Sequence, residues 1–211
     1  MTVPWRPARH GRGVLVSRGR ADAVAAWAGR GLVPVHLVPF DGWTVLLPAG
    51  PSRGHPPYDD ALQVLAGRPV PGRLRSAIGL FAVGGNAVVT MHPYGWRAVQ
   101  RWVVWAPRRG VVPPERLAAG RPGDLARTAG ADRSATRAVV DALRDPSGDA
   151  YRVLADLCAA LGLPGARLLD GHDRPQDMDG YRLVEPGSQH VARFHAAVTE
   201  DARLRAEMEE D

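Results

Sequence analysis

Short runs of β-branched and aromatic residues, separated by turn-forming residues, dominate the first half of the chain. This pattern predicts strands at residues 13–16, 33–38, 43–47, 77–83, 87–91 and 98–105, with short helices at 21–31 and 58–66. Asp41-Gly42 and Gly84-Gly85-Asn86 each separate two of these strands, and glycine supplies the positive φ that a tight hairpin needs. The order β, α, β, β, α, β, β, β predicts an antiparallel or mixed sheet with helices on one face.

Beyond Pro113 and Pro114 the apolar positions take up helical spacing. Helices are predicted at residues 124–129, 132–143 and 149–161, and a final one begins at Ser188, with residues 165–187 as an irregular connection. The fold class is therefore expected to be α+β. We divide the chain into a basic arm at 1–12, an α+β domain at 13–112 and a helical domain at 113–211.

The charge of the chain is unevenly distributed. All 27 basic residues are Arg, which is typical of a GC-rich genome, so the total charge says little about partners. Residues 1–112 carry 14 Arg against four Asp, a net charge of +10, whereas residues 113–211 carry 13 Arg against 18 acidic residues, a net charge of −5. Two interpretations follow: the halves dock on each other, within one molecule or across a homodimer, or the basic half meets an external polyanion.

Cysteine content and hydropathy suggest a location for the protein. Cys158 is the only cysteine, so no disulfide can form within one chain, and its apolar surroundings in the sequence predict a buried thiol. No stretch reaches the ~20 apolar residues of a membrane span. We expect a cytoplasmic protein with no membrane partner.

One segment of the helical half matches a known arrangement. The features that carry the match are Leu125-Ala126 in a first helix, Ala129-Gly130 at a turn, and Val139-Val140 where a second helix packs back. Small side chains allow two helices to cross closely, Gly130 permits a sharp turn, and Asp132 is placed to cap the second helix. The segment resembles the helix-turn-helix of the lac-repressor and Cro/phage-repressor families, over about residues 124–164 only.

The resemblance implies that the second helix enters a DNA groove. Arg133, Ser134, Thr136 and Arg137 would then contact bases or phosphates, and Arg6, Arg9 and Arg12 of the arm could add phosphate contacts. Residues 113–170, however, carry eight Arg and eight acidic residues, and a neutral surface attracts phosphate weakly. The alternative is that these helices pack for purely structural reasons.

Signatures of catalysis are missing from the sequence. It holds no nucleotide-binding glycine loop, no zinc-protease motif and no serine-hydrolase elbow, and we predict neither a metal site nor a cofactor. His190 and His195 are five residues apart and so lie on different faces of a helix, while Asp173, Asp177 and Asp179 lack the spacing of a calcium loop. His92, beside aromatic residues at a strand end, is the one position that would suit an unfamiliar active site.

We therefore predict a non-enzymatic regulatory or adaptor protein whose helix-turn-helix-like segment binds DNA. The alternative is a protein–protein interaction module without nucleic-acid contact, in which the basic half meets an acidic partner or the chain's own acidic half. An enzyme with a site around His92 is the third hypothesis.

Overall fold

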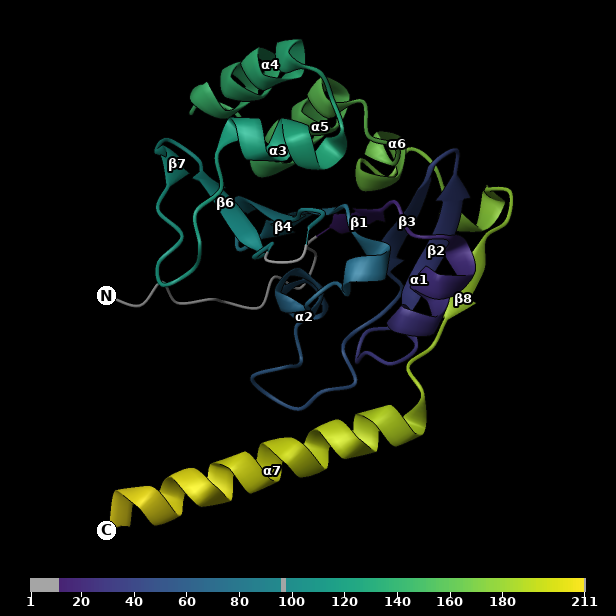
Figure 1. Cartoon of the computed structure of the whole chain (residues 1–211), viewed down its shortest axis with the longest axis vertical. Helices are drawn as coiled ribbons and strands as arrows, with labels where there is room; N and C mark the ends of the chain where they lie inside the picture. The colour runs from purple at the N-terminus through teal and green to yellow at the C-terminus, as the bar shows by residue number, and fades with distance from the viewer. Residues whose placement is uncertain (1–11, 96–97, 211) are drawn as a thin grey trace.

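The computed structural model describes residues 12–95 and 98–210 of the chain. Its centre is an eight-stranded antiparallel sheet in the order β7-β6-β5-β4-β1-β3-β2-β8 (Figure 1). The strands are β1 (Gly13–Ser17), β2 (Val35–Phe40), β3 (Trp43–Pro48), β4 (Ala77–Val83), β5 (Asn86–His92), β6 (Arg101–Ala106), β7 (Gly110–Val112) and β8 (Arg182–Val184). The predicted α+β class is confirmed, and of the two predicted sheet types the antiparallel one is present.

Turn chemistry fixes the two predicted hairpins. Strands β2 and β3 pair from Val35↔Pro48 to Phe40↔Trp43, and the turn between them places Gly42 at φ 68°. Strands β4 and β5 pair over seven residues around Gly84 and Gly85, which have φ values of 59° and 81°. Both turns need backbone angles that residues with a Cβ rarely adopt, which is why the glycines mark them in the sequence.

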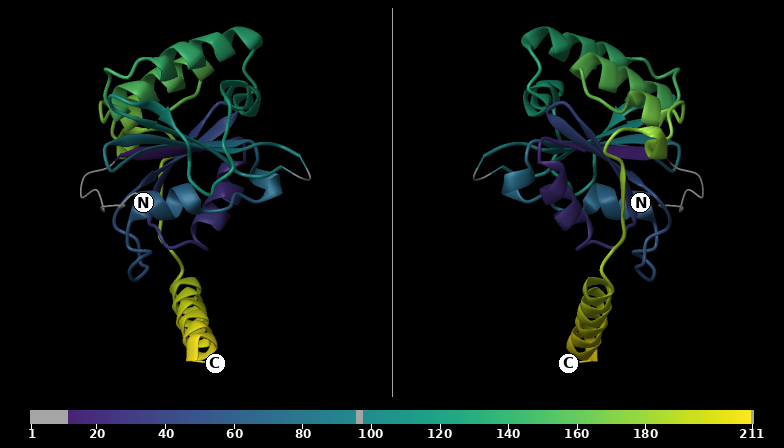
Figure 2. Two further views of the ribbon diagram at one scale, coloured as in Figure 1. Left: turned by 90° about the vertical axis from the view of Figure 1, so that its left-hand side faces the viewer. Right: turned by 90° about the vertical axis from the view of Figure 1, so that its right-hand side faces the viewer.

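Helices cover both faces of this sheet, as the two side views in Figure 2 show. The helices are α1 (Ala21–Ala28), α2 (Ala61–Gly67), α3 (Pro122–Ala129), α4 (Arg133–Arg144), α5 (Ala150–Leu161), α6 (Ala166–Leu169) and α7 (Ser188–Glu210), with 3-10 turns at Gly72–Leu74 and Pro175–Asp177. Helices α1 and α2 lie on one face, and α3, α4 and α5 form a layer on the other. The expectation of helices on a single face thus holds only for the two helices of the first half.

Successive side chains of a strand point to opposite faces of the sheet, so the apolar strands supply a hydrophobic core to each face. In β4, Leu80 packs in a cluster that includes Leu154 of α5, while the next residue, Phe81, packs in the opposite cluster with Leu65 of α2. All three leucines and Phe81 are almost fully buried. The sheet of the first half and the helices of the second half therefore share one hydrophobic core.

Three elements were not anticipated from the sequence. Strand β7 follows β6 through a turn at Arg108 and Arg109, and β8 pairs with β2 at the opposite edge. Helix α6 lies with β8 in the stretch that we expected to be irregular. Strands of three residues and a helix of four carry no readable periodicity, because long-range pairing and packing create them.

Helix α7 stands apart from the layers. It runs beneath the face that carries α1 and α2, and its far end extends past the body (Figure 1). The residues just before it are attached to the body: the N–H of Gly187 donates to the carbonyl of Gly29 at 2.8 Å, and Arg53 forms an ion pair with Glu185 at 3.3 Å. From Thr199 to Met208 every side chain is exposed.

Candidate nucleic-acid interface

A three-residue connection joins α3 to α4 at the turn predicted around Gly130, and α4 begins one residue later than predicted, after Asp132. Gly130 ends α3 in the left-handed conformation, with φ 70°, and the N–H of Ala131 still donates to the carbonyl of Ala126 at 3.0 Å. Asp132 caps α4, since its carboxylate accepts the backbone N–H groups of Ser134 and Ala135 at 2.7 and 3.2 Å. The turn residue and the cap thus act together to redirect the chain within one turn of helix.

The inner faces of α3, α4 and α5 meet in the core above the sheet. Leu125 is fully buried on α3, and Val139 of α4 is equally buried. Helix α5 contributes Leu154 and Leu157 to the same cluster. Helices α3 and α5 contact strand β4, while α4 packs mainly on those two helices, so α4 lies outermost in the layer (Figures 1 and 2).

The outer face of α4 carries two of the predicted DNA-contacting residues. Arg133 and Arg137 are exposed and one helical turn apart, and neither forms an ion pair with any residue in the described part of the chain. The other arginines of α3, α4 and α5 are paired, Arg127 with Asp124, Arg144 with Asp141 and Arg152 with Asp156, and Arg167 of α6 is paired with Asp173. The first two turns of α4 therefore offer two guanidinium groups without an acidic partner among the described residues.

The other two predicted residues, Ser134 and Thr136, are less available for contact with DNA. The hydroxyl of Ser134 donates to the carboxylate of Asp132, and Thr136 is half-buried. The hydrogen bond from the Ser134 hydroxyl, together with the backbone N–H groups of Ala135 and Ser134, lowers the pKa of Asp132. A permanent negative charge consequently stands beside Arg133 at neutral pH.

Of the predicted arm residues, only Arg12 falls within the described part of the chain; Arg6 and Arg9 lie outside it. The guanidinium of Arg12 donates to the backbone carbonyl of Asp170, at the end of α6. This contact ties the residue before β1 to the end of α6. Arg12 thus has an intramolecular partner, whereas Arg133 and Arg137 do not have an acidic one among the described residues.

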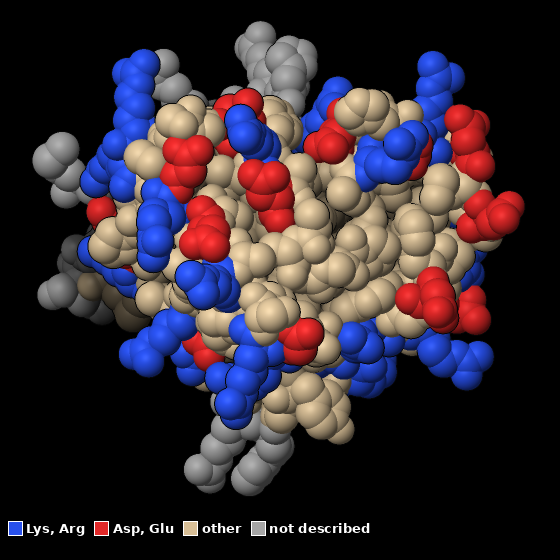
Figure 3. Space-filling model, turned by 90° about the horizontal axis from the view of Figure 1, so that it is seen from above, with Lys and Arg blue, Asp and Glu red and all other residues tan. Residues whose placement is uncertain are grey.

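The view onto α4 shows blue and red side chains interspersed rather than a continuous basic surface (Figure 3). The sequence explains this mixture: six Arg and six Asp occur between residues 121 and 162. Any attraction of this face for phosphate must therefore come from the local arrangement of charges and not from its total.

Two contacts that hold the layer in place were not apparent from the sequence. Arg18, at the end of β1, donates to the carbonyl of Ala129 at 2.8 Å, and its guanidinium lies 4.4 Å from the ring centre of Trp43. It caps the C-terminus of α3, where the helix dipole favours a cation. Because Arg18 and Ala129 are 111 residues apart, no local pattern could reveal the contact.

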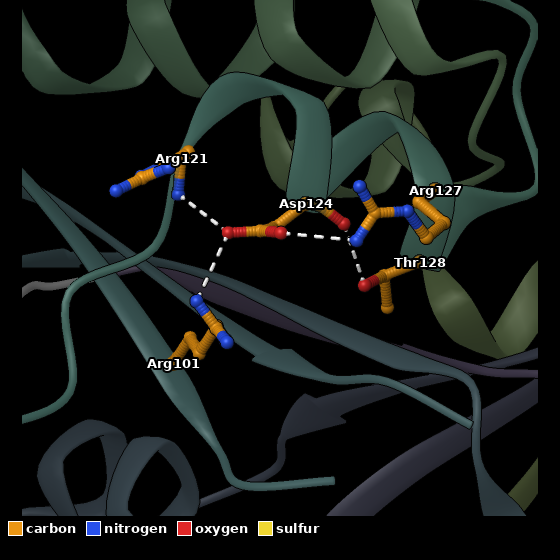
Figure 4. A network of polar contacts seen from close by, with 5 residues as sticks. All are labelled: Arg101, Arg121, Asp124, Arg127 and Thr128. Carbon is orange, nitrogen blue, oxygen red and sulfur yellow. Dashed lines mark hydrogen bonds and ion pairs between the residues drawn. The ribbon is translucent and has the colours of Figure 1, made fainter. Parts of the chain in front are cut away.

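The second contact is a network around Asp124 at the start of α3 (Figure 4). Its carboxylate accepts the backbone N–H of Arg121 at 3.1 Å and forms ion pairs with Arg101 of β6 at 3.2 Å and Arg127 at 3.1 Å. The hydroxyl of Thr128 donates to the Asp124 carbonyl at 2.7 Å. The network fixes the N-terminus of α3 on the sheet, and it gives both Arg101 and Arg127 an acidic partner.

The residues considered for catalysis or metal binding are dispersed. His92 is only 2% exposed and faces the layer of α1 and α2. The described residues contain no group of three or more histidine, cysteine or acidic side chains that could hold a metal ion. Within the same part of the chain, no helix is both long and apolar enough to cross a bilayer.

Comparison with family models, with curated proteins and with solved structures gave no match to this chain.

Proposed function

We propose that the protein binds duplex DNA through the first two turns of α4. The observation that carries the proposal is the pair of exposed guanidinium groups, Arg133 and Arg137, on the outermost helix of the layer. Guanidinium groups bind phosphate oxygens and guanine edges with matching planar geometry. An exposed helix that begins directly after a tight turn is the element that enters the major groove in helix-turn-helix proteins.

The support of α4 from behind also favours this role. A recognition helix must keep its orientation while its outer face is occupied, and the buried Ala135, Val139 and Leu143 provide that anchorage. Capping by Asp132 fixes the start of the helix, and both arginines stand in its first two turns. The arginines can therefore reach a groove without unfolding or rearranging the layer behind them.

The balanced charge of the layer sets the expected strength of binding. Each phosphate contact lowers the salt slope of the association constant by about 0.9, so two contacts give a weak, salt-sensitive interaction. Affinity for an arbitrary duplex is then expected in the ~10⁻⁴ to 10⁻⁶ M range of nonspecific complexes. Binding should accordingly be sought at low ionic strength.

The test is a fluorescence anisotropy titration of the full chain with a labelled duplex of about two helical turns at low salt. The variant Arg133→Ala with Arg137→Ala should weaken binding about fivefold or more. The matched control, Arg144→Ala with Arg152→Ala, removes the same number of charges from arginines already paired with Asp141 and Asp156 and should bind like the wild type. Equal weakening in both double variants, or no binding by the wild type, would reject the proposal.

A further inference from the structure

A pocket of about 530 Å³ lies on the side of the molecule opposite α4. It is bounded by the residues that follow α1, by the loop before α2, by α2 and the residues after it, and by the first turns of α7. Small-molecule sites commonly measure about 300 to 1,000 Å³ and lie where several elements meet. This pocket meets both conditions.

The walls of the pocket are mostly apolar. Leu32, Val64 and Phe194 line it together with Tyr58. The ring of Tyr58 meets the ring of Phe194 edge-on, with the ring centres 5.0 Å apart, so the loop before α2 and the start of α7 form a joined aromatic wall. The neighbouring rings of His55 and His195 stack at 4.2 Å and strengthen the same junction. A pocket of this kind suits a flat apolar group.

Two guanidinium groups line the same pocket. Arg68 donates to the carbonyls of Trp27 and Ala28, and it lies 4.0 Å from the ring centre of Trp27. Burial lowers the pKa of Arg68 to about 10, which still leaves it cationic at neutral pH. Arg30 is exposed and makes no ion pair with any residue that the structure describes.

These charges have no acidic counterpart in the lining. None of the residues that line the pocket is Asp or Glu, and its remaining polar side chains, among them Gln63 and His190, carry no fixed negative charge. Two guanidinium groups next to apolar walls favour binding of a ligand that has an anionic group at one end and an apolar group at the other. A carboxylate is the simplest such head, because guanidinium binds it through two parallel hydrogen bonds.

We propose that this pocket binds a small aromatic carboxylate, with the carboxylate on Arg30 and Arg68 and the ring between Val64 and Phe194. This site is independent of the proposed DNA contact, since it uses no residue of α3, α4 or α5. Helix α7 forms one of its walls, so an occupied pocket also holds the start of that helix against the body.

The test uses isothermal titration of the full chain with naphthalene-2-carboxylate and with the neutral naphthalene-2-carboxamide. The carboxylate should bind about tenfold more tightly than the carboxamide, because only the anion makes charge-assisted hydrogen bonds. Arg30→Gln should reduce carboxylate affinity about tenfold and leave carboxamide affinity unchanged. Val64→Phe, which fills the pocket, should weaken both ligands.

The control is Arg109→Gln, which removes an exposed arginine from the turn between β6 and β7, outside the pocket, and should have no effect. Circular dichroism melting checks that each variant folds. Absence of saturable carboxylate binding up to about 1 mM would overturn the site. Equal affinity for the two ligands, or carboxylate affinity unchanged by Arg30→Gln, would overturn the proposed contact with the anion. Ligand affinity unchanged by Val64→Phe would show that the ligand binds outside this pocket.

Discussion

Acidification should destabilise this protein through one buried histidine. His92 ends strand β5, is 2% exposed, and its Nε2 has no hydrogen-bond partner among the described residues. Burial, with a smaller contribution from the charge of Arg75, lowers the pKa of His92 to about 4. The ring is therefore neutral in the folded protein under conditions where an unfolded chain begins to protonate it.

The sign and size of the effect follow from linkage. Because the pKa is lower in the folded state than the ~6.5 of an unfolded chain, the unfolded state binds more protons between these values. The contribution of His92 to the free energy of unfolding is therefore at its full value above about pH 6.5. It is lost progressively as the pH falls towards about 4, because the unfolded state then binds a proton that the folded state excludes. At about 1.4 kcal/mol for each pKa unit, the loss reaches roughly 3 kcal/mol, a large share of the stability of a domain.

Urea unfolding followed by tryptophan fluorescence, at several pH values between about 7 and 4, measures this loss. The variant His92→Gln removes the titrating group, so its free energy of unfolding should fall less steeply with pH than that of the wild type. His92→Phe serves as a second, apolar replacement in case the amide itself destabilises the core. Parallel pH profiles for the wild type and both variants would refute the reasoning.

Two substitutions and one labelling experiment test the packing of the helical layer on the sheet. Leu154→Ala, at a fully buried position that contacts both layers, should cost about 2 to 5 kcal/mol in denaturant unfolding, with the sheet and the helical layer lost in one transition; two separate transitions would contradict the shared core. Arg18→Ala removes the cap on Ala129 and the contact with Trp43, and should cost about 1 to 2 kcal/mol by the same measurement, whereas an unchanged midpoint would assign no stabilising role to that contact. Cys158 is fully buried and its pKa is raised to about 12, so a thiol reagent should label it only in denaturant, and rapid labelling of the folded protein would contradict its burial.

Local chemistry made much of this fold predictable. Gly42 and Gly84 mark turns whose backbone angles almost exclude other residues, and Asp60 and Asp132 cap the helices that follow them. Such signals act over two or three residues, so they can be read without knowing the rest of the structure. The left-handed Gly130 between α3 and α4 belongs to the same class.

The parts that escaped prediction depend on residues distant in sequence. Strand β8 exists because Arg182 to Val184 pair with β2, about 145 residues earlier in the chain. The hydrogen bond from Arg18 to the carbonyl of Ala129, and the pocket between α2 and α7, likewise arise only when the chain has folded. The lack of an acidic partner for Arg137 could not be predicted either, because Asp141 stands at i,i+4 from Arg137 and at i,i+3 from Arg144, and only the structure shows that it pairs with Arg144.

The salt dependence of the association constant tests the DNA contact most directly, because its slope is proportional to the number of phosphates that the protein contacts. The association constant for a fixed duplex is measured by anisotropy between about 50 and 200 mM salt, and its logarithm is plotted against the logarithm of salt concentration. We predict that Arg133→Ala with Arg137→Ala makes the slope shallower by about 2, while Arg144→Ala with Arg152→Ala leaves the wild-type slope. Identical slopes for the wild type and the Arg133, Arg137 variant would contradict the assignment of α4 as the DNA-contacting helix.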